Sequence, residues 1–173
     1  SFHFYPGLID TSILYRRALD RGTLIAAYLS SFGKPVFMGE FGWVGGNTEP
    51  VTLGGTTFPP SAEEQSAVWC RDLVTATRPY CCGWLNWGTF DIPESLDCTR
   101  HSGMVAADGR IKAWGRMFQA WAPAISASRP AEGLPRHPFE REPLISSGER
   151  RAEELQRWTH ALRAEGAFVL AEA

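Results

Sequence analysis

Short apolar runs alternate along the chain with longer segments in which apolar residues recur every three or four positions. Each apolar run has the length of one buried strand, and each longer segment has the period of an amphipathic helix. The apolar runs are residues 2–5, 35–39 and 83–87. The helical segments span about residues 11–31, residues from about 61 onward, and residues around 111–121. This alternation predicts an α/β fold built from successive strand–helix units with parallel strands.

Two of the predicted helices carry additional signals. Ser61 and Glu64 have the spacing of a capping box, which predicts that the middle helix begins near Ser61. The last helix has an aromatic stripe at spacings of three, four and three: Ile111, Trp114, Phe118 and Trp121. Stripes of this kind are typical of helices that cover one face of a sheet.

The spacing of the strands favours a (β/α)8, or TIM, barrel. The strands begin near residues 2, 35 and 82, so the successive steps are 33 and 47 residues. A barrel of ~250 residues averages about 31 residues per unit, and both steps fit once a loop insertion is allowed. A doubly wound sheet fits the spacing too, but no glycine-rich phosphate turn follows a strand. Three units cannot close a barrel, so we expect either that the other units precede this chain or that the chain forms an open half.

The character of the sequence changes after the barrel-like segment, residues 1–122. Residues 123–147 are rich in proline, serine, glutamate and arginine, which predicts a linker or a surface strap. Residues 148–173 predict a C-terminal amphipathic helix, whose apolar face is formed by Ala152, Leu155, Trp158 and Leu162. Such a helix either packs on the barrel or docks a partner, and the large indole of Trp158 favours packing.

Composition excludes several classes of function. The net charge of -2 and the pI near 6.1 do not fit a nucleic-acid-binding protein. No apolar run reaches the ~18 residues of a membrane span. The four cysteines, Cys70, Cys81, Cys82 and Cys98, lack zinc-ligand spacing, and we expect buried thiols and no metal or cofactor. A disulfide of Cys70 or Cys98 stays an alternative.

Polar residues gather at the predicted carboxyl ends of the three strands, where parallel barrels hold their active sites. Glu40 ends the second strand, and Trp87 ends the third. His3 and Tyr5 lie on one face of the first strand because side chains alternate along a strand. A carboxylate at the end of a buried strand is either salt-bridged or functional. Its combination with a His/Tyr pair and a tryptophan predicts a sugar-binding site.

These strand ends carry a family resemblance. His3-x-Tyr5, the run from Lys34 to Gly42 and the run from Asn86 to Asp91 resemble strands six, seven and eight of clan A glycoside hydrolases. The nearest is glycoside hydrolase family 5, the cellulase family, and Asp108 to Lys112 resembles the way that family ends its barrel. The resemblance spans residues 1–122. It implies the last three βα units of a TIM barrel, with the N-terminal half of the barrel upstream of Ser1.

The resemblance also implies roles for individual residues. Glu40 would be the nucleophile of a retaining mechanism, which forms a covalent glycosyl-enzyme. Tyr5 would donate a hydrogen bond that keeps Glu40 ionised and aimed at the anomeric carbon, and His3 would lie beside the sugar. Trp87 would be the floor on which the sugar ring stacks. Further predicted substrate contacts are Trp43, Asn86 and Asp91, whereas Trp84 is assigned to the core. For Trp43, core packing is an equal alternative.

The sequence departs from the family in its second carboxyl group. Retaining hydrolysis needs an acid/base about 5–5.5 Å from the nucleophile, and the family supplies it from an Asn-Glu pair that ends strand four. The only similar string here, Asn47 to Pro50, places Glu49 in the loop after Glu40. We therefore expect the acid/base upstream of Ser1 and an inactive chain when it is taken alone.

The predicted function is a retaining O-glycosyl hydrolase of β-linked poly- or oligosaccharides, cellulase-like, of which this chain is the nucleophile-bearing half. Its expected partners are a carbohydrate substrate and the missing barrel half. The alternative is a non-catalytic carbohydrate-binding or interaction protein on a degenerate barrel. An aldolase-type barrel finds little support, because Lys34 and Lys112 flank the predicted elements. Analogy with the family favours secretion.

Overall fold

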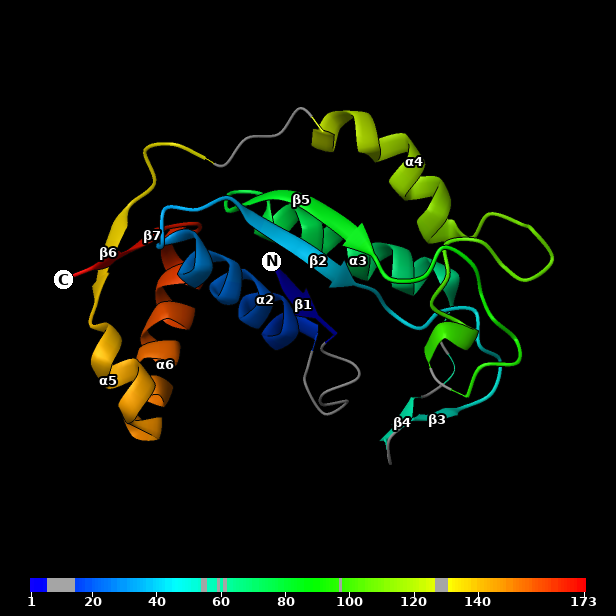
Figure 1. Cartoon of the computed structure of the whole chain (residues 1–173), viewed down its shortest axis with the longest axis horizontal. Coiled ribbons are helices and arrows are strands. Elements are labelled where there is room, and N and C mark those ends of the chain that lie inside the picture. The colour runs from blue at the N-terminus through cyan, green and yellow to red at the C-terminus, as the bar shows by residue number, and fades with distance from the viewer. Residues whose placement is uncertain (6–14, 54–55, 59, 61, 97, 127–130) are drawn as a thin grey trace.

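The computed structural model describes residues 1–5, 15–53, 56–58, 60, 62–96, 98–126 and 131–173. The chain forms a main sheet with its helices and a smaller C-terminal unit (Figure 1). The elements of the main part are β1 (Phe2–Phe4), α2 (Tyr15–Ser30), β2 (Val36–Phe41), β3 (Val51–Leu53), β4 (Thr56–Phe58), α3 (Glu63–Thr77), β5 (Cys81–Asn86), the 3-10 turn η1 (Cys98–Arg100) and α4 (Ala113–Ser126). Those of the C-terminal unit are β6 (Arg136–Phe139), α5 (Arg141–Ser146), α6 (Gly148–Glu165) and β7 (Val169–Glu172).

The main sheet has the order β1-β2-β5, and both pairs of neighbours are parallel. Helices follow the strands as the alternation of the sequence predicts, and α2 packs on α3, which in turn packs on α4. The predicted α/β fold with parallel strands is therefore confirmed. The long loop after β2 contains the antiparallel hairpin of β3 and β4.

One face of this sheet forms the main core with the helices, and the other face is open. Val36, Met38 and Phe41 of β2 are buried, as is Trp84 of β5, which the sequence assigns to the core. The opposite face bears large apolar side chains in contact with solvent: Phe37 is 39% exposed and Leu85 is 56% exposed. Parallel sheets are usually covered on both faces, so this open face is unusual for a finished domain.

Helix boundaries differ from the sequence pattern at two places. Residues 11–14 of the first predicted helix and Ser61 of the capping box lie outside the described residues, and α3 has Ala62 as its N-cap. The last helix begins at Ala113, so the placement of Ile111 on its aromatic stripe is wrong. Ile111 bridges to Val105 instead, which leaves its side chain 43% exposed. Trp114 is buried in the core as the stripe predicts.

Glu63 ties the start of α3 to the start of α4. Its carboxylate accepts hydrogen bonds from the Arg110 guanidinium at 2.7 and 3.1 Å and from the Ala113 backbone N–H at 3.1 Å. The last bond satisfies one of the N–H groups that a helix leaves open at its first turn. The hydrogen bond from Arg110, above all, holds the pKa of Glu63 below its usual value.

Replacing Glu63 by glutamine is expected to remove part of the acid sensitivity of folding. The pKa of Glu63 is lower in the folded state than the ordinary value of 4.5. The ionised carboxylate therefore stabilises the folded state fully above pH 4.5, and this stabilisation is lost as the pH falls below 4.5. At pH 7 the free energy of unfolding of the variant should be lower by about 1.5–3 kcal/mol, the size of a lost hydrogen bond to a charged group. Urea unfolding at pH 7 and pH 3.5 measures this, and an equal loss at both values would contradict it.

The C-terminal unit is more ordered than the sequence indicates. The predicted linker, residues 123–147, contains the end of α4, the strand β6 and the helix α5. β6 pairs in parallel with β7, which the sequence pattern does not reveal. The helix predicted over residues 148–173 is confirmed as α6 up to Glu165, but its extension to residue 173 is wrong, because Val169–Glu172 form the strand β7. Trp158 is buried in a second core. That core consists of Leu24, Phe139, Leu144, Trp158, Ala161, Phe168 and Leu170.

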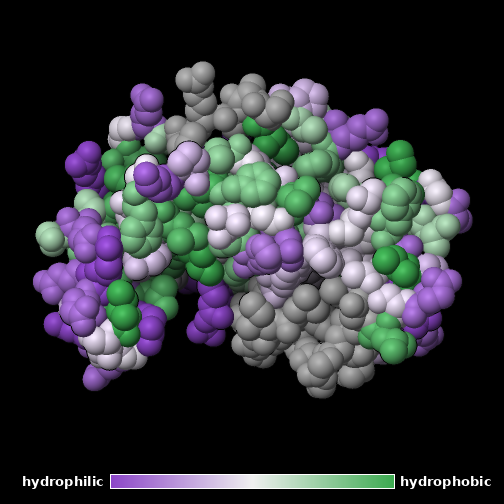
Figure 2. Space-filling view, in the orientation of Figure 1, coloured by the Kyte–Doolittle hydropathy of each residue, from purple (hydrophilic) through white to green (hydrophobic). Residues whose placement is uncertain are grey.

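This unit packs firmly on the main part. Asp20 of α2 is buried and accepts hydrogen bonds from the Arg163 guanidinium of α6 at 2.6 and 2.8 Å. The buried Tyr80 hydroxyl accepts a hydrogen bond from the Phe168 N–H at 3.1 Å. Leu24 of α2 belongs to the second core. The packing favoured by Trp158 is thus confirmed, and in Figure 2 hydrophilic side chains gather on the outer side of this unit, at the left.

The cysteines differ from one another. Cys70 and Cys81 are buried free thiols, as predicted, and burial raises the pKa of Cys81 to about 12. Cys82 is exposed, so its assignment to the core is wrong; its thiol donates to the Val36 carbonyl at 3.1 Å. The side chain of Cys98 lies outside the described residues. Within the described residues no helix is long and apolar enough to cross a membrane, and no group of side chains suits a metal ion.

Candidate active site

Three strand ends bring the predicted site residues to one edge of the main sheet. β1 and β2 run parallel, and an irregularity after Phe2 sets His3 opposite Glu40 in their pairing. Glu40 is the last but one residue of β2, and its side chain is 26% exposed. A carboxylate at this position is neither buried nor fully solvated, so its neighbours decide how it is oriented.

Both neighbours from the first strand hold the same oxygen of Glu40. The Tyr5 hydroxyl donates a hydrogen bond to Oε2 at 2.9 Å, and His3 Nδ1 lies 3.1 Å from that atom. Among the described residues Oε1 accepts no hydrogen bond. These two side chains therefore fix one oxygen of Glu40, and the other accepts no hydrogen bond from the part of the chain that the structure describes.

The third strand adds Trp87 to the same edge. Phe41 pairs with Asn86, and the Trp87 N–H donates to the Phe41 carbonyl at 2.8 Å. A Cβ atom added to Gly42 would lie 3.6 Å from the Trp87 carbonyl oxygen and 3.9 Å from the Tyr5 ring. The two residues therefore approach each other across Gly42, just beyond Glu40. The Trp87 side chain is 42% exposed, which leaves its indole available for stacking.

Asn86 has its hydrogen-bonding groups engaged inside the protein. Its Oδ1 accepts from the Trp114 indole N–H at 2.7 Å, and its Nδ2 donates to the carbonyls of Trp87 and Gly88 at 3.1 and 3.0 Å. The residue is buried. These contacts favour a role in holding the turn that carries Trp87 over a direct contact with sugar, which stays a prediction.

Asp91 is likewise engaged in structure. Both of its carboxylate oxygens lie 3.0 Å from Lys112 Nζ, and Oδ1 also accepts from the Gly103 N–H at 2.8 Å. The pair is nearly buried, with side chains 5% and 12% exposed for lysine and aspartate. Removing one partner of such a pair leaves an uncompensated charge. These contacts favour a role for Asp91 in fixing the loop between β5 and α4.

Two further residues are placed differently from the strand ends. Trp43 is half-buried and stacks at a tilt on Trp69, with ring centroids 4.9 Å apart, so its contacts favour the core alternative. Glu49 is exposed in the loop after β2, where its backbone carbonyl accepts from Asn47 Nδ2 at 3.0 Å. Sequence reasoning missed the Asn86–Trp114 and Asp91–Lys112 links, since no local pattern joins residues so far apart.

Comparison with known proteins finds matches among solved structures alone. No protein-family model and no curated protein matches this sequence. A GH5_18 glycoside hydrolase from Bifidobacterium longum subsp. longum, solved in complex with Manβ1-4GlcNAc, matches with a TM-score of 0.71 at 16% identity, covering 99% of this chain and 42% of that one. A GH5_18 from Bifidobacterium longum subsp. infantis matches with a TM-score of 0.62 at 24% identity, covering 92% and 38%.

This chain has the fold of a partial glycoside hydrolase family 5 barrel. A third structure of the same subfamily, from Streptomyces cattleya and in complex with Manβ1-4GlcNAc, gives a TM-score of 0.59 at 14% identity, covering 91% of this chain and 40% of that one. The chain thus spans about two fifths of the length of these enzymes. Because one match covers 99% of the chain, it includes the C-terminal unit as well as the barrel-like part. The fold that the resemblance implies, part of a glycoside hydrolase barrel, is confirmed.

Proposed function

We propose that this chain is the nucleophile-bearing part of a retaining glycoside hydrolase that acts on β-linked saccharides. The observation that carries the proposal is Glu40 at the carboxyl end of β2, with Oε2 held by Tyr5 and His3 and with Oε1 accepting no hydrogen bond from the described residues. A carboxylate held by one oxygen presents the other in a fixed direction, which lowers the entropy lost in attack.

In the proposed reaction Oε1 of Glu40 attacks the anomeric carbon of the sugar. A bond forms between that carbon and the carboxylate, the glycosidic bond breaks, and the leaving oxygen takes a proton from the acid/base residue. Water, deprotonated by the same residue, then displaces Glu40 and releases the sugar. Tyr5 and His3 hold the carboxylate throughout, and the Trp87 indole supports the apolar face of the ring.

The second carboxyl group has to come from outside the described strand ends. The chain spans about two fifths of the length of the matched glycoside hydrolases, and the exposed Phe37 and Leu85 leave one sheet face open for further barrel strands. We infer a longer protein in which a preceding barrel half supplies the acid/base, and an inactive chain without it. Glu49 is the alternative donor within the chain.

The structural neighbours indicate which substrates to test first. Two of them hold Manβ1-4GlcNAc, so a β1-4-linked mannosyl disaccharide is the first substrate to test. A cellulosic β-glucan, which the sequence resemblance implies, is the second. In both substrates the scissile bond is a β-linkage that is equatorial in the relaxed sugar ring. The same nucleophile position therefore serves either substrate, and the loops around the site determine which one binds.

Mechanism-based labelling tests the nucleophile. The longer protein, with its preceding barrel half, is treated with a 2-deoxy-2-fluoro-β-mannosyl or -glucosyl fluoride, and the modified peptide is sequenced by mass spectrometry. We expect one sugar on Glu40 and none on Glu49. A label on Glu49, or on a carboxylate outside this chain, would remove the assignment. Binding of Manβ1-4GlcNAc without labelling or turnover would favour the non-catalytic alternative.

Replacing Tyr5 by phenylalanine is expected to lower kcat by about 10- to 100-fold, because a hydrogen bond to a charged group contributes about 1.5–3 kcal/mol. The variant keeps the ring beside Gly42 and loses the hydroxyl that bonds Glu40 Oε2. Steady-state kinetics at pH 7 measure this loss, and a change in KM with kcat intact would contradict the role.

A further inference from the structure

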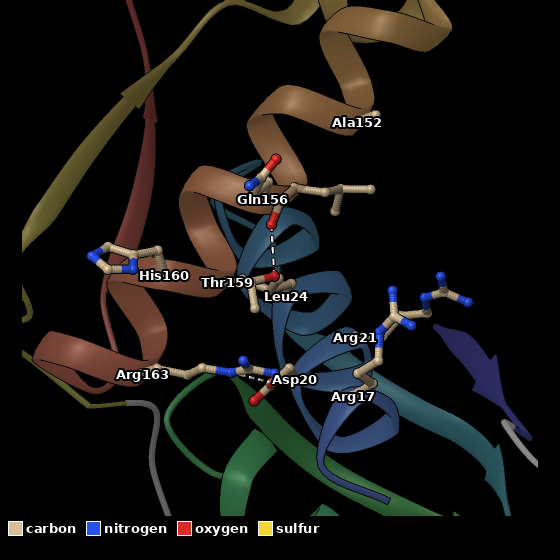
Figure 3. Close-up of a pocket in the computed structure, with 10 residues that line it drawn as sticks. Arg17, Asp20, Arg21, Leu24, Ala152, Gln156, Thr159, His160 and Arg163 are labelled. Atoms are coloured by element: carbon tan, nitrogen blue, oxygen red, sulfur yellow. Dashed lines mark hydrogen bonds and ion pairs between the residues drawn. The ribbon is translucent and has the colours of Figure 1, made fainter. Parts of the chain in front are cut away.

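A groove runs between α2 and α6 (Figure 3). Its volume is about 680 Å³. Arg17, Asp20, Arg21 and Leu24 line it from α2, and Ala152, Leu155, Gln156, Thr159, His160 and Arg163 line it from α6. From Arg17 to Leu24 there are seven steps along α2, and from Ala152 to Arg163 eleven along α6, or roughly 10 and 16 Å of helix at 1.5 Å per residue. A helix of two or three turns has these dimensions.

The groove is basic. Asp20, its acidic residue, is already paired with Arg163 at 2.6 Å and with Arg16 at 3.2 Å. Arg17 and Arg21 are exposed and bond no acidic side chain among the described residues. Both extend from α2 away from α6 in Figure 3. An occupant that brings carboxylates suits them best, because a guanidinium taken out of water needs a partner and a carboxylate also balances its charge.

The groove is also where the predicted apolar face of α6 is left uncovered. Trp158 of that face is buried, but Ala152 and Leu155 are exposed, Leu155 by 38%. Both line the groove. An occupant with a narrow apolar stripe flanked by acidic residues would cover these two side chains and the two arginines together.

The topology of the main sheet indicates which segment this is. β1 pairs with β2 on one edge, and its other edge pairs with no described strand. A preceding parallel strand at that edge would be joined to β1 by a right-handed crossover, so its helix would lie on the same face as α2. It would sit on the side of α2 away from α3. Figure 1 shows α6 on that side.

We propose that the groove between α2 and α6 receives the helix that directly precedes β1 in the longer protein, and that this helix presents acidic side chains to Arg17 and Arg21. The proposal rests on the proposed function in requiring a preceding barrel half. The proposal also gives the C-terminal unit a role. α6 is anchored to α2 by the Arg163–Asp20 ion pair, and it would pack on the outside of the preceding barrel half.

Photo-cross-linking on the longer protein identifies the occupant. Arg21→benzoylphenylalanine is expected to cross-link within one chain to a peptide that lies in the roughly 31 residues before β1, the length of one barrel unit. The same probe at Arg151, exposed on α6 and outside the groove, is the control and should not reach that peptide. A cross-link to a second copy, to another segment, or none at all would overturn the proposal.

Charge reversal tests the acidic character of the occupant. Arg17→Glu with Arg21→Glu should lower the midpoint of thermal unfolding by about 4 °C, and 0.5 M salt should reduce the difference. The control variant, Lys34→Glu with Arg151→Glu, makes the same change in net charge at exposed positions. It should shift the midpoint of thermal unfolding by less than about 1 °C. Equal shifts would overturn the charge pairing.

The labelling of Glu40, measured on the same samples, separates the two proposals. A labelled Glu40 with a misplaced cross-link removes the groove assignment and leaves the hydrolase intact. An unlabelled Glu40 with the expected cross-link does the reverse.

Discussion

Replacing Glu40 by alanine is expected to lower kcat of the longer hydrolase by roughly 10⁴-fold or more, as the loss of a covalent nucleophile does in other enzymes. The reason lies in the geometry at the end of β2. Tyr5 and His3 both bind Oε2, and alanine removes the oxygen that attacks while leaving these two side chains in place. Substrate binding through Trp87 should persist, so KM should change far less than kcat.

Azide supplies the test that separates a nucleophile from a structural residue. In the cavity that Glu40→Ala leaves, a small anion can attack the anomeric carbon from the same side as the lost carboxylate. With an activated aryl β-glycoside, azide should restore turnover and give the α-glycosyl azide, since a single displacement inverts the centre. A structural role for Glu40 would allow no such rescue.

Glu49→Gln is the matched control for Glu40. Glu49 is exposed in the loop after β2, and we expect its glutamine variant to keep kcat within about threefold, as surface substitutions usually do. A large loss that azide restores as the β-glycosyl azide would instead identify Glu49 as the acid/base. That result would place both carboxyl groups within this chain and remove the need for an upstream donor.

The strand ends were readable from the sequence because their signals are local. Period-two alternation places His3 and Tyr5 on one side of a strand, and parallel strands bring their carboxyl ends to one edge. The contacts of both residues with Glu40 follow from these two rules. The rules do not specify the irregularities between β1, β2 and β5, which set the final register.

Other parts of the fold depend on residues far apart in the sequence. Pro138 lies within β6, and proline argues against a strand in any local reading. The strand forms because β7, some thirty residues later, pairs with it. Asn86 and Asp91 look like rim residues in the sequence, whereas Trp114 and Lys112 of the following segment engage them. Such partners are set by packing and not by local pattern.

Replacing Trp158 by alanine is expected to destabilise the protein by about 3–5 kcal/mol, the range for truncating a large buried aromatic residue. Trp158 is 3% exposed and lies between Phe139 of β6, at 6.1 Å between ring centroids, and Tyr28 of α2, at 6.5 Å. Its removal would leave a cavity where the C-terminal unit meets the main part. The midpoint of urea unfolding should fall, with α2 and α6 loosening together in hydrogen exchange.

Trp158→Phe is the control that identifies packing as the cause. The indole N–H of Trp158 is buried and donates to no described residue, so phenylalanine keeps most of the apolar contact and removes a polar group with no partner. We expect a loss of less than about 1.5 kcal/mol, as for a conservative core exchange. If residues 123–173 behaved as a strap with a separately packed helix, Trp158→Ala would leave the midpoint of the main part unchanged. If instead the midpoint falls in a single cooperative transition, the second core and the main core unfold together, and the C-terminal unit is an integral layer of this fold.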